Sequence, residues 1–501
     1  MCRLRLTTVL GALILLAILC TWSMGTARYG GPDEPAHVLR AAAVANGQIY
    51  GELAPGLPPG YRSVLVPATL ATGDPACFRL QPARNGSCSQ ATTRPGMVSV
   101  ATSAANYPPL YYALLGYPAK WLGGASDAGT YRLMAAIGNW FVLILVAARL
   151  RCFGERALVM LATITPAAWF LSGVVNPNGL EIALIALAWV GVAQLGQSHP
   201  SVGALMWIGG PMAVAIAVRP VAIFACAAIF VVVICARVGW RQLAILGIPP
   251  TFAIVAVEVW NMWIGLTVSD SRTRVSATPS AALWHSLASL PTALNQAIGS
   301  LSWLELQAPW PVVALWGATA AATAGVGLLT DRGSRHGPWW LWLGSLVLAP
   351  IVFTLATYSR IGYIWQGRYS IPILIGLAAL YLRSPEVPSA RPGWKISGLW
   401  LGTYVIGEIT TFWVALRRYV VGTNGSWWFA QRAPGDPNNQ SARWEPSLPP
   451  LVLLSTHIVL VLALSVIASA AFSGSASLSG SDDTRPARRS AGPERRSVTT
   501  S

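Results

Sequence analysis

Residues 7–24 read TTVLGALILLAILCTWSM and contain no charged side chain, whereas Arg3 and Arg5 precede them. A helix needs about 20 mostly apolar residues to cross the hydrocarbon core of a bilayer. The stretch therefore predicts a transmembrane helix with its basic flank on the cytoplasmic side. A cleaved signal peptide is the alternative. Because no clear cleavage site with small residues follows the apolar run, we expect an uncleaved anchor over residues 1–24.

Further apolar runs indicate that lipid surrounds much of the chain. Together with the first run, they predict twelve membrane spans at 7–24, 131–149, 156–175, 178–196, 202–218, 220–237, 241–266, 311–330, 338–357, 369–383, 396–416 and 450–473. The composition agrees, since 54% of the 501 residues are hydrophobic and only 10% are charged, against about 25% charged in soluble proteins. We expect an all-α integral membrane protein with about 12 transmembrane helices and large extracytoplasmic loops.

The net charge of +16 does not indicate a nucleic-acid-binding protein. The basic residues are scattered between apolar runs, and they are not gathered on one face of a helix. Basic residues on cytoplasmic loops orient membrane proteins, which accounts for much of the excess. The chain is rich in Ala, Trp, Arg and Gly and poor in Lys. This bias is typical of a bacterial genome rich in G and C.

The basic residues also predict the sidedness of the chain. With twelve spans, four groups of basic residues between spans fall together on the cytoplasmic side, namely Arg149 with Arg151 and Arg156, Arg237 with Arg241, Arg332 with Arg335, and Arg383 with Arg391 and Lys395. We therefore expect a multi-pass protein of the bacterial cytoplasmic (inner) membrane with both termini in the cytoplasm. The run 108–122 is short and contains prolines, so it predicts an interfacial or re-entrant helix.

This sidedness divides the chain into four regions. They are the anchor at 1–24, a first extracytoplasmic loop at 25–130, a multi-span core with outer loops at 131–476, and a disordered basic cytoplasmic tail at 477–501. Of the seven cysteines, only Cys77 and Cys88 fall in outer loops. The oxidising side of the membrane permits them to pair, so we predict a disulfide between them.

Two adjacent carboxylates, Asp33 and Glu34, follow the first span closely and are bracketed by Pro32 and Pro35. Their side chains point in different directions, so one can face a substrate while the other binds a partner. Carboxylates beside the membrane surface suit a general base or a metal ligand. The structural alternative is a helix cap, in which the Asp33 side chain accepts hydrogen bonds from backbone N–H groups.

The motif 32–37, Pro-Asp-Glu-Pro-Ala-His, resembles the opening of the domain of unknown function 2142 family of bacterial membrane proteins. Three further stretches fit that resemblance: Asn-Tyr-Pro-Pro-Leu-Tyr-Tyr at 106–112, Asn-Pro-Asn-Gly at 176–179, and Gln-Gly-Arg-Tyr at 366–369. The resemblance covers roughly residues 5–475. It implies a fold like that of the C-type glycosyltransferase superfamily, whose members use polyprenyl-phosphate sugars. It also implies an Asp or Asp-Glu pair in the first outer loop, which makes Asp33 and Glu34 the expected catalytic residues.

The sequence departs from the family pattern at one position that bears on metal binding. The second motif of this family commonly reads Asn-Pro-Asp, but Asn178 stands where the carboxylate is expected. Glu181, one helical turn later, is the candidate replacement. A carboxylate favoured by the N-terminal end of a helix is its structural alternative. A divalent metal cofactor therefore stays open at this stage.

A lipid-linked donor keeps its chain in the bilayer and its phosphate at the interface, where arginines can bind that phosphate. The candidate cations are Arg368, Arg360, Arg219 and Lys120. Arg368 is the best placed, and Arg219 is suggestive because a charge at a tight turn between two apolar runs is unusual. Snorkelling to the lipid headgroups is the alternative for both. Trp427, Trp428 and Trp444 are better explained as interfacial residues than as sugar-stacking groups. The expected substrate-binding residues are His37, Arg40, Asn106, Tyr107, Asn176, Asn178, Arg219, Arg360, Gln366, Arg368 and Tyr369.

The leading functional hypothesis is a membrane glycosyltransferase. It would transfer a sugar from a polyprenyl-phosphate donor to a cell-envelope glycan or lipid acceptor on the outer face. A transporter or flippase of a lipid-linked saccharide is the alternative, because twelve spans is a common transporter size. Transporters usually bind substrate near the midplane of the membrane. The predicted spans carry few ionisable residues apart from Glu181, Glu258 and Glu408, whereas the polar motifs cluster outside the spans. This distribution favours an enzyme that works at the outer interface. An inactive envelope scaffold is the third hypothesis, because the carboxylate expected at Asn178 is missing.

Overall fold

The computed structural model describes most of the chain with its side chains. The described ranges are 2–53, 56–57, 60–71, 77–89, 95–195, 200–235, 238–265, 278–331, 336–384, 392–430 and 443–476. The predicted tail at 477–501 lies outside these ranges, as do Arg237, Arg332, Arg335 and Arg391.

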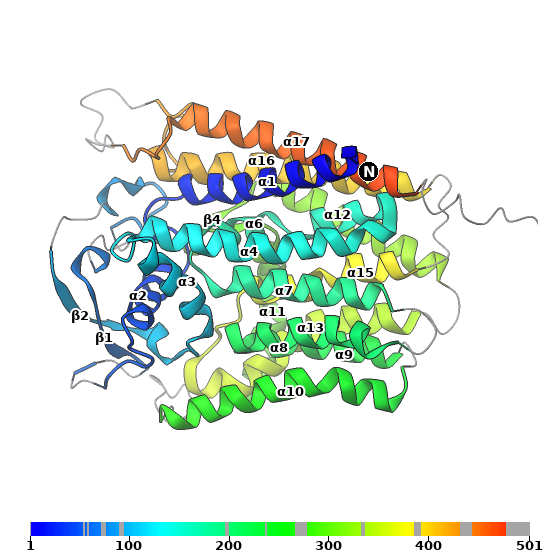
Figure 1. Ribbon diagram of the computed structural model, residues 1–501, viewed down its shortest axis with the longest axis horizontal. Coiled ribbons are helices and arrows are strands. Elements are labelled where there is room, and N and C mark those ends of the chain that lie inside the picture. The colour runs from blue at the N-terminus through cyan, green and yellow to red at the C-terminus, as the bar shows by residue number, and fades with distance from the viewer. Residues whose placement is uncertain are drawn as a thin grey trace, which may run out of the picture.

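The long helices lie side by side along one direction, and the first outer loop caps one end of this bundle (Figure 1). Among the described residues, seven stretches are long and apolar enough to cross a membrane. They are Leu6–Met24, Ala128–Thr163, Trp240–Trp263, Trp310–Thr330, Gly337–Ser359, Ile396–Val421 and Pro450–Phe472. The fold is therefore that of a predominantly helical membrane protein.

The bundle contains further, shorter helices besides these seven spans. The helices of the bundle are α1 (Cys2–Met24), α4 (Ala128–Leu150), η5 (Arg151–Ala157), α5 (Leu158–Thr163), α6 (Pro166–Gly173), α7 (Pro177–Ala193), α8 (Val202–Val218), η6 (Pro220–Ala222), α9 (Ile223–Cys235), α10 (Trp240–Trp263), α12 (Trp310–Thr330), α13 (Gly337–Ile361), η8 (Gly367–Tyr369), α14 (Ile371–Leu374), α15 (Gly376–Arg383), α16 (Pro392–Val421) and α17 (Pro450–Ala476).

The prediction of twelve spans is only partly confirmed. Three predicted spans coincide with the shorter apolar helices Pro177–Ala193, Val202–Val218 and Pro220–Cys235. The predicted span 156–175 is broken where Ile164 adopts an extended backbone before α6 starts at Pro166. The predicted span 369–383 is divided among η8, α14 and α15. Pro166 and Pro372 occupy the first turn of the helices that follow these breaks, a position that proline favours. Hydropathy alone does not show such breaks.

The first outer loop folds into a small unit of its own. It contains α2 (Glu34–Ala45), β1 (Arg62–Pro67), η1 (Ala68–Leu70), η3 (Gly86–Ser89), β2 (Met97–Thr102), η4 (Ser103–Asn106) and α3 (Leu110–Trp121). The strands β1 and β2 pair antiparallel, with Arg62 opposite Thr102 and Pro67 opposite Met97. Helix α3 packs on α2 and exposes Leu114 and Trp121, as an interfacial helix would.

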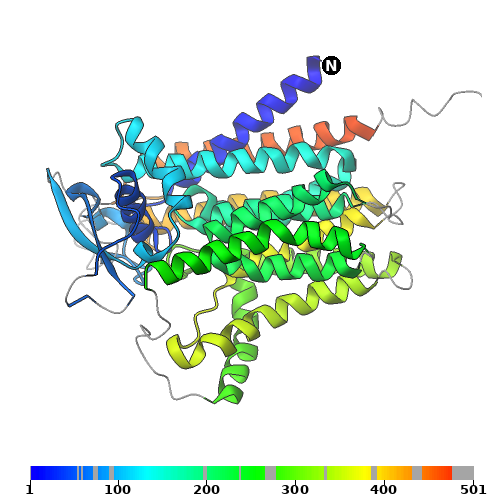
Figure 2. The same cartoon turned by 60° about the horizontal axis from the view of Figure 1, so that its bottom comes forward.

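Two further features belong to segments that we predict to lie on the outer side. The structure joins Cys77 and Cys88 by a disulfide. Helix α11 (Pro279–Gly299) is followed by the short strands β3 (Ser300–Leu301) and β4 (Leu306–Gln307), which pair with each other. Figure 2 shows α11 lying crosswise to the long helices. It packs against α13 and against η8.

Both ends of the described chain lie at the same end of the bundle. The first turn of α1 and the last turns of α17 are together at the right of Figure 1, opposite α2, β1 and β2. Helices α1 and α17 also pack against each other. This arrangement agrees with the expectation that the two termini share one side of the membrane, while the side itself stays a prediction.

Candidate functional site

The adjacent carboxylates Asp33 and Glu34 face different surroundings. Asp33 precedes α2 with a left-handed backbone (φ 57°), and its side chain makes no capping hydrogen bond. The helix-cap alternative for Asp33 is therefore wrong. Instead, Asp33 Oδ2 accepts a hydrogen bond from Arg368 Nη2 at 2.7 Å. The Asp33 side chain is 47% exposed, so one of its faces is open to a substrate.

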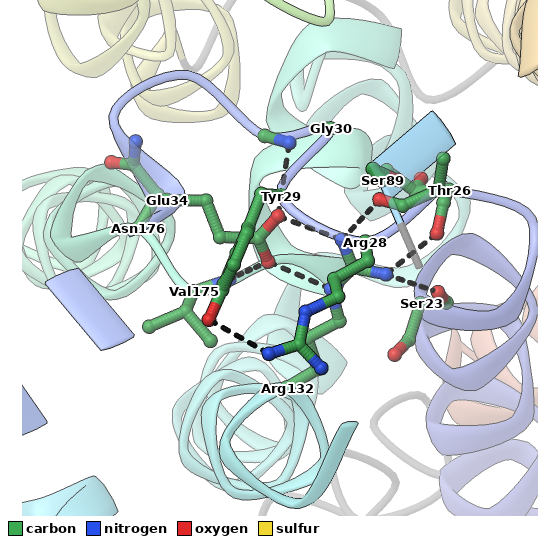
Figure 3. A network of polar contacts seen from close by, with 12 residues as sticks. Ser23, Thr26, Arg28, Tyr29, Gly30, Glu34, Ser89, Arg132, Val175 and Asn176 are labelled. Atoms are coloured by element: carbon green, nitrogen blue, oxygen red, sulfur yellow. Dashed lines mark hydrogen bonds and ion pairs between the residues drawn. The ribbon is translucent and has the colours of Figure 1, made fainter. Parts of the chain in front are cut away.

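Glu34 is enclosed in a network of hydrogen bonds (Figure 3). Its two oxygens accept from Arg132 Nε and Nη2, both at 2.7 Å. They also accept from the backbone N–H groups of Gly31 at 3.0 Å and Val175 at 3.1 Å. The Glu34 side chain is 1% exposed. These contacts favour a structural role for Glu34 and leave Asp33 as the accessible carboxylate.

Arg132 extends this network to the end of α1. Its guanidinium donates to the carbonyl oxygens of Ser23 at 3.0 Å, Thr26 at 2.6 Å and Ala27 at 2.6 Å. The ion pair between Arg132 and Glu34 therefore fixes the turn that leads from the first span to Asp33. Sequence reasoning did not single out Arg132, although a charge at the start of an apolar run was a visible signal.

Two buried arginines lie beside Asp33. Arg219 is 7% exposed and Arg368 is 5% exposed, and both interact electrostatically with Asp33. Arg219 Nη2 donates to the Tyr369 hydroxyl at 3.3 Å, and its guanidinium lies over the Tyr107 ring at 5.0 Å. Within the described part of the chain, Arg219 Nη1 and Arg368 Nε and Nη1 are buried without a hydrogen-bond partner. The site therefore holds concentrated positive charge with unused donors.

Arg368 is positioned by the close approach of two backbones. The Gly367 N–H donates to Gln296 Oε1 of α11 at 3.0 Å. A Cβ at Gly367 would collide with the backbone of Ala293 and Ala297 in α11. Only glycine fits here, which explains why glycine precedes the arginine in this motif. Gln366 Oε1 is also buried without a partner in the described part of the chain.

The Asn-Pro-Asn motif starts α7 and contacts the Asp33 loop. Asn176 caps α7 by accepting from the Asn178 N–H at 2.9 Å, and Asn176 Nδ2 donates to the Pro32 carbonyl at 2.8 Å. Asn178 Nδ2 donates to Glu181 Oε2 at 2.7 Å. Glu181 is close enough to Arg219 and Arg368 to interact electrostatically with both. These residues therefore border the arginine pair.

The residues match a family model over most of the chain. The model describes a predicted membrane protein of the domain of unknown function 2142 (DUF2142) and matches residues 15–377. The chain belongs to this family. The match includes Asp33, Arg219, Arg368 and the residues around them. The matched range is shorter than the expected 5–475, and α16 and α17 lie beyond its end. No curated protein matches the chain.

In this DUF2142 protein, burial and charge set the protonation of the site. Burial alone would raise the pKa of Asp33, but Arg368 and also Arg219 outweigh it, so this pKa lies below its usual range. Burial, followed by repulsion from Arg219, lowers the pKa of His37 to about 3. His37 Nδ1 lies 2.9 Å from the Tyr112 hydroxyl. At neutral pH, Asp33 is a carboxylate and His37 is uncharged.

Several predicted site residues have structural partners instead. Arg40 donates to the carbonyl oxygens of Gln48 at 3.1 Å and Ile49 at 2.5 Å. Asn106 accepts from Arg62 Nε at 2.7 Å and donates to the Gly60 carbonyl. The side chain of Arg360 lies outside the described residues. Thus the structure brings together Asp33, His37, Tyr107, Asn176, Asn178, Arg219, Gln366, Arg368 and Tyr369, together with Glu181.

The described residues do not fit a metal centre. Among them, no three His, Cys, Asp or Glu side chains are grouped to hold a metal ion. The positive charge near Asp33 comes from Arg219 and Arg368 instead.

Proposed function

We propose that this protein is a membrane glycosyltransferase. It transfers a sugar from a polyprenyl-phosphate donor to a cell-envelope glycan or lipid acceptor on the outer face of the bacterial inner membrane. The observation that carries the proposal is the pair of buried arginines beside a half-exposed carboxylate. In the described part of the chain, Arg219 and Arg368 contribute donors that have no partner, and Asp33 contributes the base.

The arginine pair suits a phosphate monoester or diester. Guanidinium groups bind phosphate oxygens through paired N–H donors. Three donor atoms of Arg219 and Arg368 are buried without a partner in the described chain, and an unmet buried donor costs about 1–3 kcal/mol. A phosphate between the two guanidinium groups would satisfy these donors. It would also stabilise the negative charge that develops as the phosphate leaves the sugar.

The reaction then requires one base. An acceptor hydroxyl oxygen attacks the anomeric carbon, and the bond from that carbon to the phosphate oxygen breaks. The electron pair of that bond goes to the phosphate, and the hydroxyl proton goes to Asp33. No oxidant or other co-reactant is needed. General-base catalysis of this kind contributes roughly 10²–10⁴-fold in rate.

The ion pair between Asp33 and Arg368 gives donor binding a second effect. Arg368 keeps the pKa of Asp33 low in the free protein, although burial opposes this. A bound phosphate competes with Asp33 for Arg368 because both are anions. As Arg368 turns toward the phosphate, Asp33 loses its counter-ion and becomes a stronger base. Thus the base is activated only when the donor is present.

The location of the site suits a lipid-linked donor. Asp33 is the residue before α2, nine positions after the end of α1. Helix α2 lies at the end of the bundle of long helices (Figure 1). A polyprenyl chain would stay among the apolar helices while its phosphate reaches the arginine pair. The acceptor would approach from the outer loops. Cytoplasmic termini and an extracytoplasmic site belong to this proposal.

The experiment that tests the proposal separates donor binding from transfer. Purified full-length protein in lipid nanodiscs is titrated with polyprenyl phosphate, and bound lipid is measured by native mass spectrometry. It is then incubated with polyprenyl-phosphate glucose or mannose and an envelope extract, and released polyprenyl phosphate is quantified. We expect saturable binding that Arg219→Ala and Arg368→Ala both weaken at least tenfold. Equal binding by the wild type and both variants would overturn the proposed donor site.

A flippase for a lipid-linked saccharide is the second candidate. The buried carboxylate Glu181 in the apolar helix α7 favours it, because ionisable residues inside membrane helices line transport paths. Proteoliposomes with a fluorescent lipid-linked sugar on one leaflet distinguish the two functions. Movement of intact lipid to the other leaflet without release of polyprenyl phosphate would favour the flippase.

A further inference from the structure

A second group of ionisable side chains lies inside the membrane helices, separate from the Asp33 site. Glu408 of α16 and His457 of α17 are both fully buried. Glu408 Oε1 and His457 Nε2 are 3.8 Å apart. Both residues lie beyond the part of the chain that the family model matches. Ionisable residues inside a membrane span are costly, and they commonly mark a functional site.

Helix α1 contributes a hydrogen-bonding partner to each member of the pair. Trp22 Nε1 donates to Glu408 Oε1 at 2.5 Å. The Thr21 hydroxyl lies 2.8 Å from His457 Nδ1, and it also donates to the Ile18 carbonyl at 2.7 Å. The Thr21 oxygen therefore accepts a hydrogen bond from the Nδ1–H group of His457, which leaves Nε2 as the nitrogen that can gain or lose a proton. In the described part of the chain, Glu408 Oε2 and His457 Nε2 are buried without a hydrogen-bond partner.

No cation in the described surroundings neutralises Glu408. On its own helix, the neighbouring polar groups are Tyr404, which interacts with it electrostatically, and Thr411. Helix α1 presents Thr21 and Trp22, and α17 presents His457. The Phe412 ring stacks on His457 at 3.8 Å, and α6 presents Trp169 beside Tyr404. Among these groups, only His457 can carry a positive charge.

The charge balance of the pair depends on one proton. Without that proton, the pair is a carboxylate beside a neutral imidazole and carries one uncompensated negative charge. With it, the pair is neutral overall, as a carboxylic acid with imidazole or as a carboxylate with imidazolium. An uncompensated charge in a low-dielectric interior is costly. The two groups are close enough to titrate as one coupled unit.

We propose that Glu408 and His457 form an intramembrane proton-binding site. The site takes up one proton from water and releases it again, and no electrons are transferred. Trp22 and Thr21 hold the two groups in place from the end of α1. The next residue, Ser23, binds Arg132 through its carbonyl, and Arg132 pairs with Glu34 beside Asp33. The proton site is thus connected to the helix end that positions the outer site, but it does not depend on the proposed transfer activity.

Infrared difference spectroscopy on the full-length protein in lipid nanodiscs tests the carboxyl group. Spectra are compared between mildly acidic and mildly alkaline buffer, in H2O and in D2O. We expect a carboxylic-acid C=O band that depends on pH and shifts in D2O. The band should disappear in Glu408→Gln and stay in Glu445→Gln, because the Glu445 side chain is 64% exposed. If Glu408→Gln does not fold, Glu408→Asp replaces it, and the band should then change in frequency.

The imidazole gives an independent measurement. The chain has five histidines, so nitrogen NMR on histidine-labelled protein can assign His457 by the loss of its signals in His457→Gln. We expect the His457 signals to change over the same pH interval as the infrared band, and over a different interval in the Glu408 variant. A Glu408 band and His457 signals that are constant with pH would overturn the proposal. The pair would then be only a polar contact that fastens α1 to α16 and α17.

Discussion

Asp33 and Arg368 are 335 positions apart in the sequence, and their side chains form an ion pair of 2.7 Å. The pair joins the loop after α1 to the short helix η8 beside α11. Each of the two side chains can also bind a further partner. Asp33 is half-exposed, and two nitrogen atoms of Arg368 have no partner in the described structure. An ion pair of this kind can open when a competing anion arrives.

The first prediction concerns Asp33 as the base. Asp33→Asn keeps the size of the side chain and removes its negative charge. We expect sugar transfer to fall roughly 10²–10⁴-fold, the usual contribution of a general base. Binding of polyprenyl phosphate should not weaken, because Arg368 loses an anionic competitor. The measurement is release of polyprenyl phosphate together with native mass spectrometry of the bound lipid. Full transfer activity in Asp33→Asn would contradict the assignment.

The second prediction concerns Glu34, whose substitution should lower the stability of the protein. Glu34→Gln removes a buried charge and leaves Arg132 buried without a counter-ion. Breaking a buried ion pair on one side costs about 3–5 kcal/mol. We therefore expect a clear drop in the melting temperature in detergent. Glu445→Gln is the control, because its ion pair with Arg443 is exposed, and exposed pairs contribute about 0–1 kcal/mol. A similar drop in melting temperature in both variants would contradict the stabilising role of the ion pair between Glu34 and Arg132.

Gly367 tests how Arg368 is held. A Cβ at Gly367 would meet the backbone of α11, and overpacking of this kind costs about 1–3 kcal/mol. Gly367→Ala should therefore lower the melting temperature and weaken binding of polyprenyl phosphate together. Gly317 in α12 is the matched control, because a Cβ there has open space around it. Gly317→Ala should leave both values unchanged or raise the melting temperature slightly. Unchanged lipid binding in Gly367→Ala would contradict this positioning role.

The predicted sidedness can be tested with one native thiol. Cys152 is exposed and lies in η5, which we expect on the cytoplasmic side. Ser126, in the first outer loop, is also exposed. In Ser126→Cys, a membrane-impermeant thiol reagent should label residue 126 in intact cells. It should label Cys152 only after the cells are permeabilised. The reverse pattern would overturn the proposed orientation.

The sequence predicted the long spans and pointed to many of the residues that lie together in the candidate site, because both signals are local. Apolar length identifies a span such as Pro450–Phe472, and unusual polar motifs identified Asp33 and Arg368. The contacts of those residues were not predictable, because they join distant segments. Arg132 is an example: it pairs with Glu34 from 98 positions away. The break at Ile164 was also missed, because the mean hydropathy of 156–175 is that of a continuous span, although Thr165 and Pro166 form a helix-start signal.

The last prediction concerns pH. His37 is buried and uncharged, and burial, together with Arg219, lowers its pKa to about 3, against about 6.5 in an unfolded chain. Between these values the unfolded chain binds a proton that the folded protein does not. Stability from this residue is therefore complete above about pH 6.5 and declines as pH falls toward 3, by up to about 1.4 kcal/mol per pH unit. His37→Gln should remove this slope from melting temperatures measured between these limits. His285→Gln, at an exposed position, should keep it. The pKa of Asp33 lies below its usual range. The stability that the ionised Asp33 contributes is therefore lost only at the most acidic pH values. An unchanged slope in His37→Gln would show that His37 already binds its proton in the folded protein.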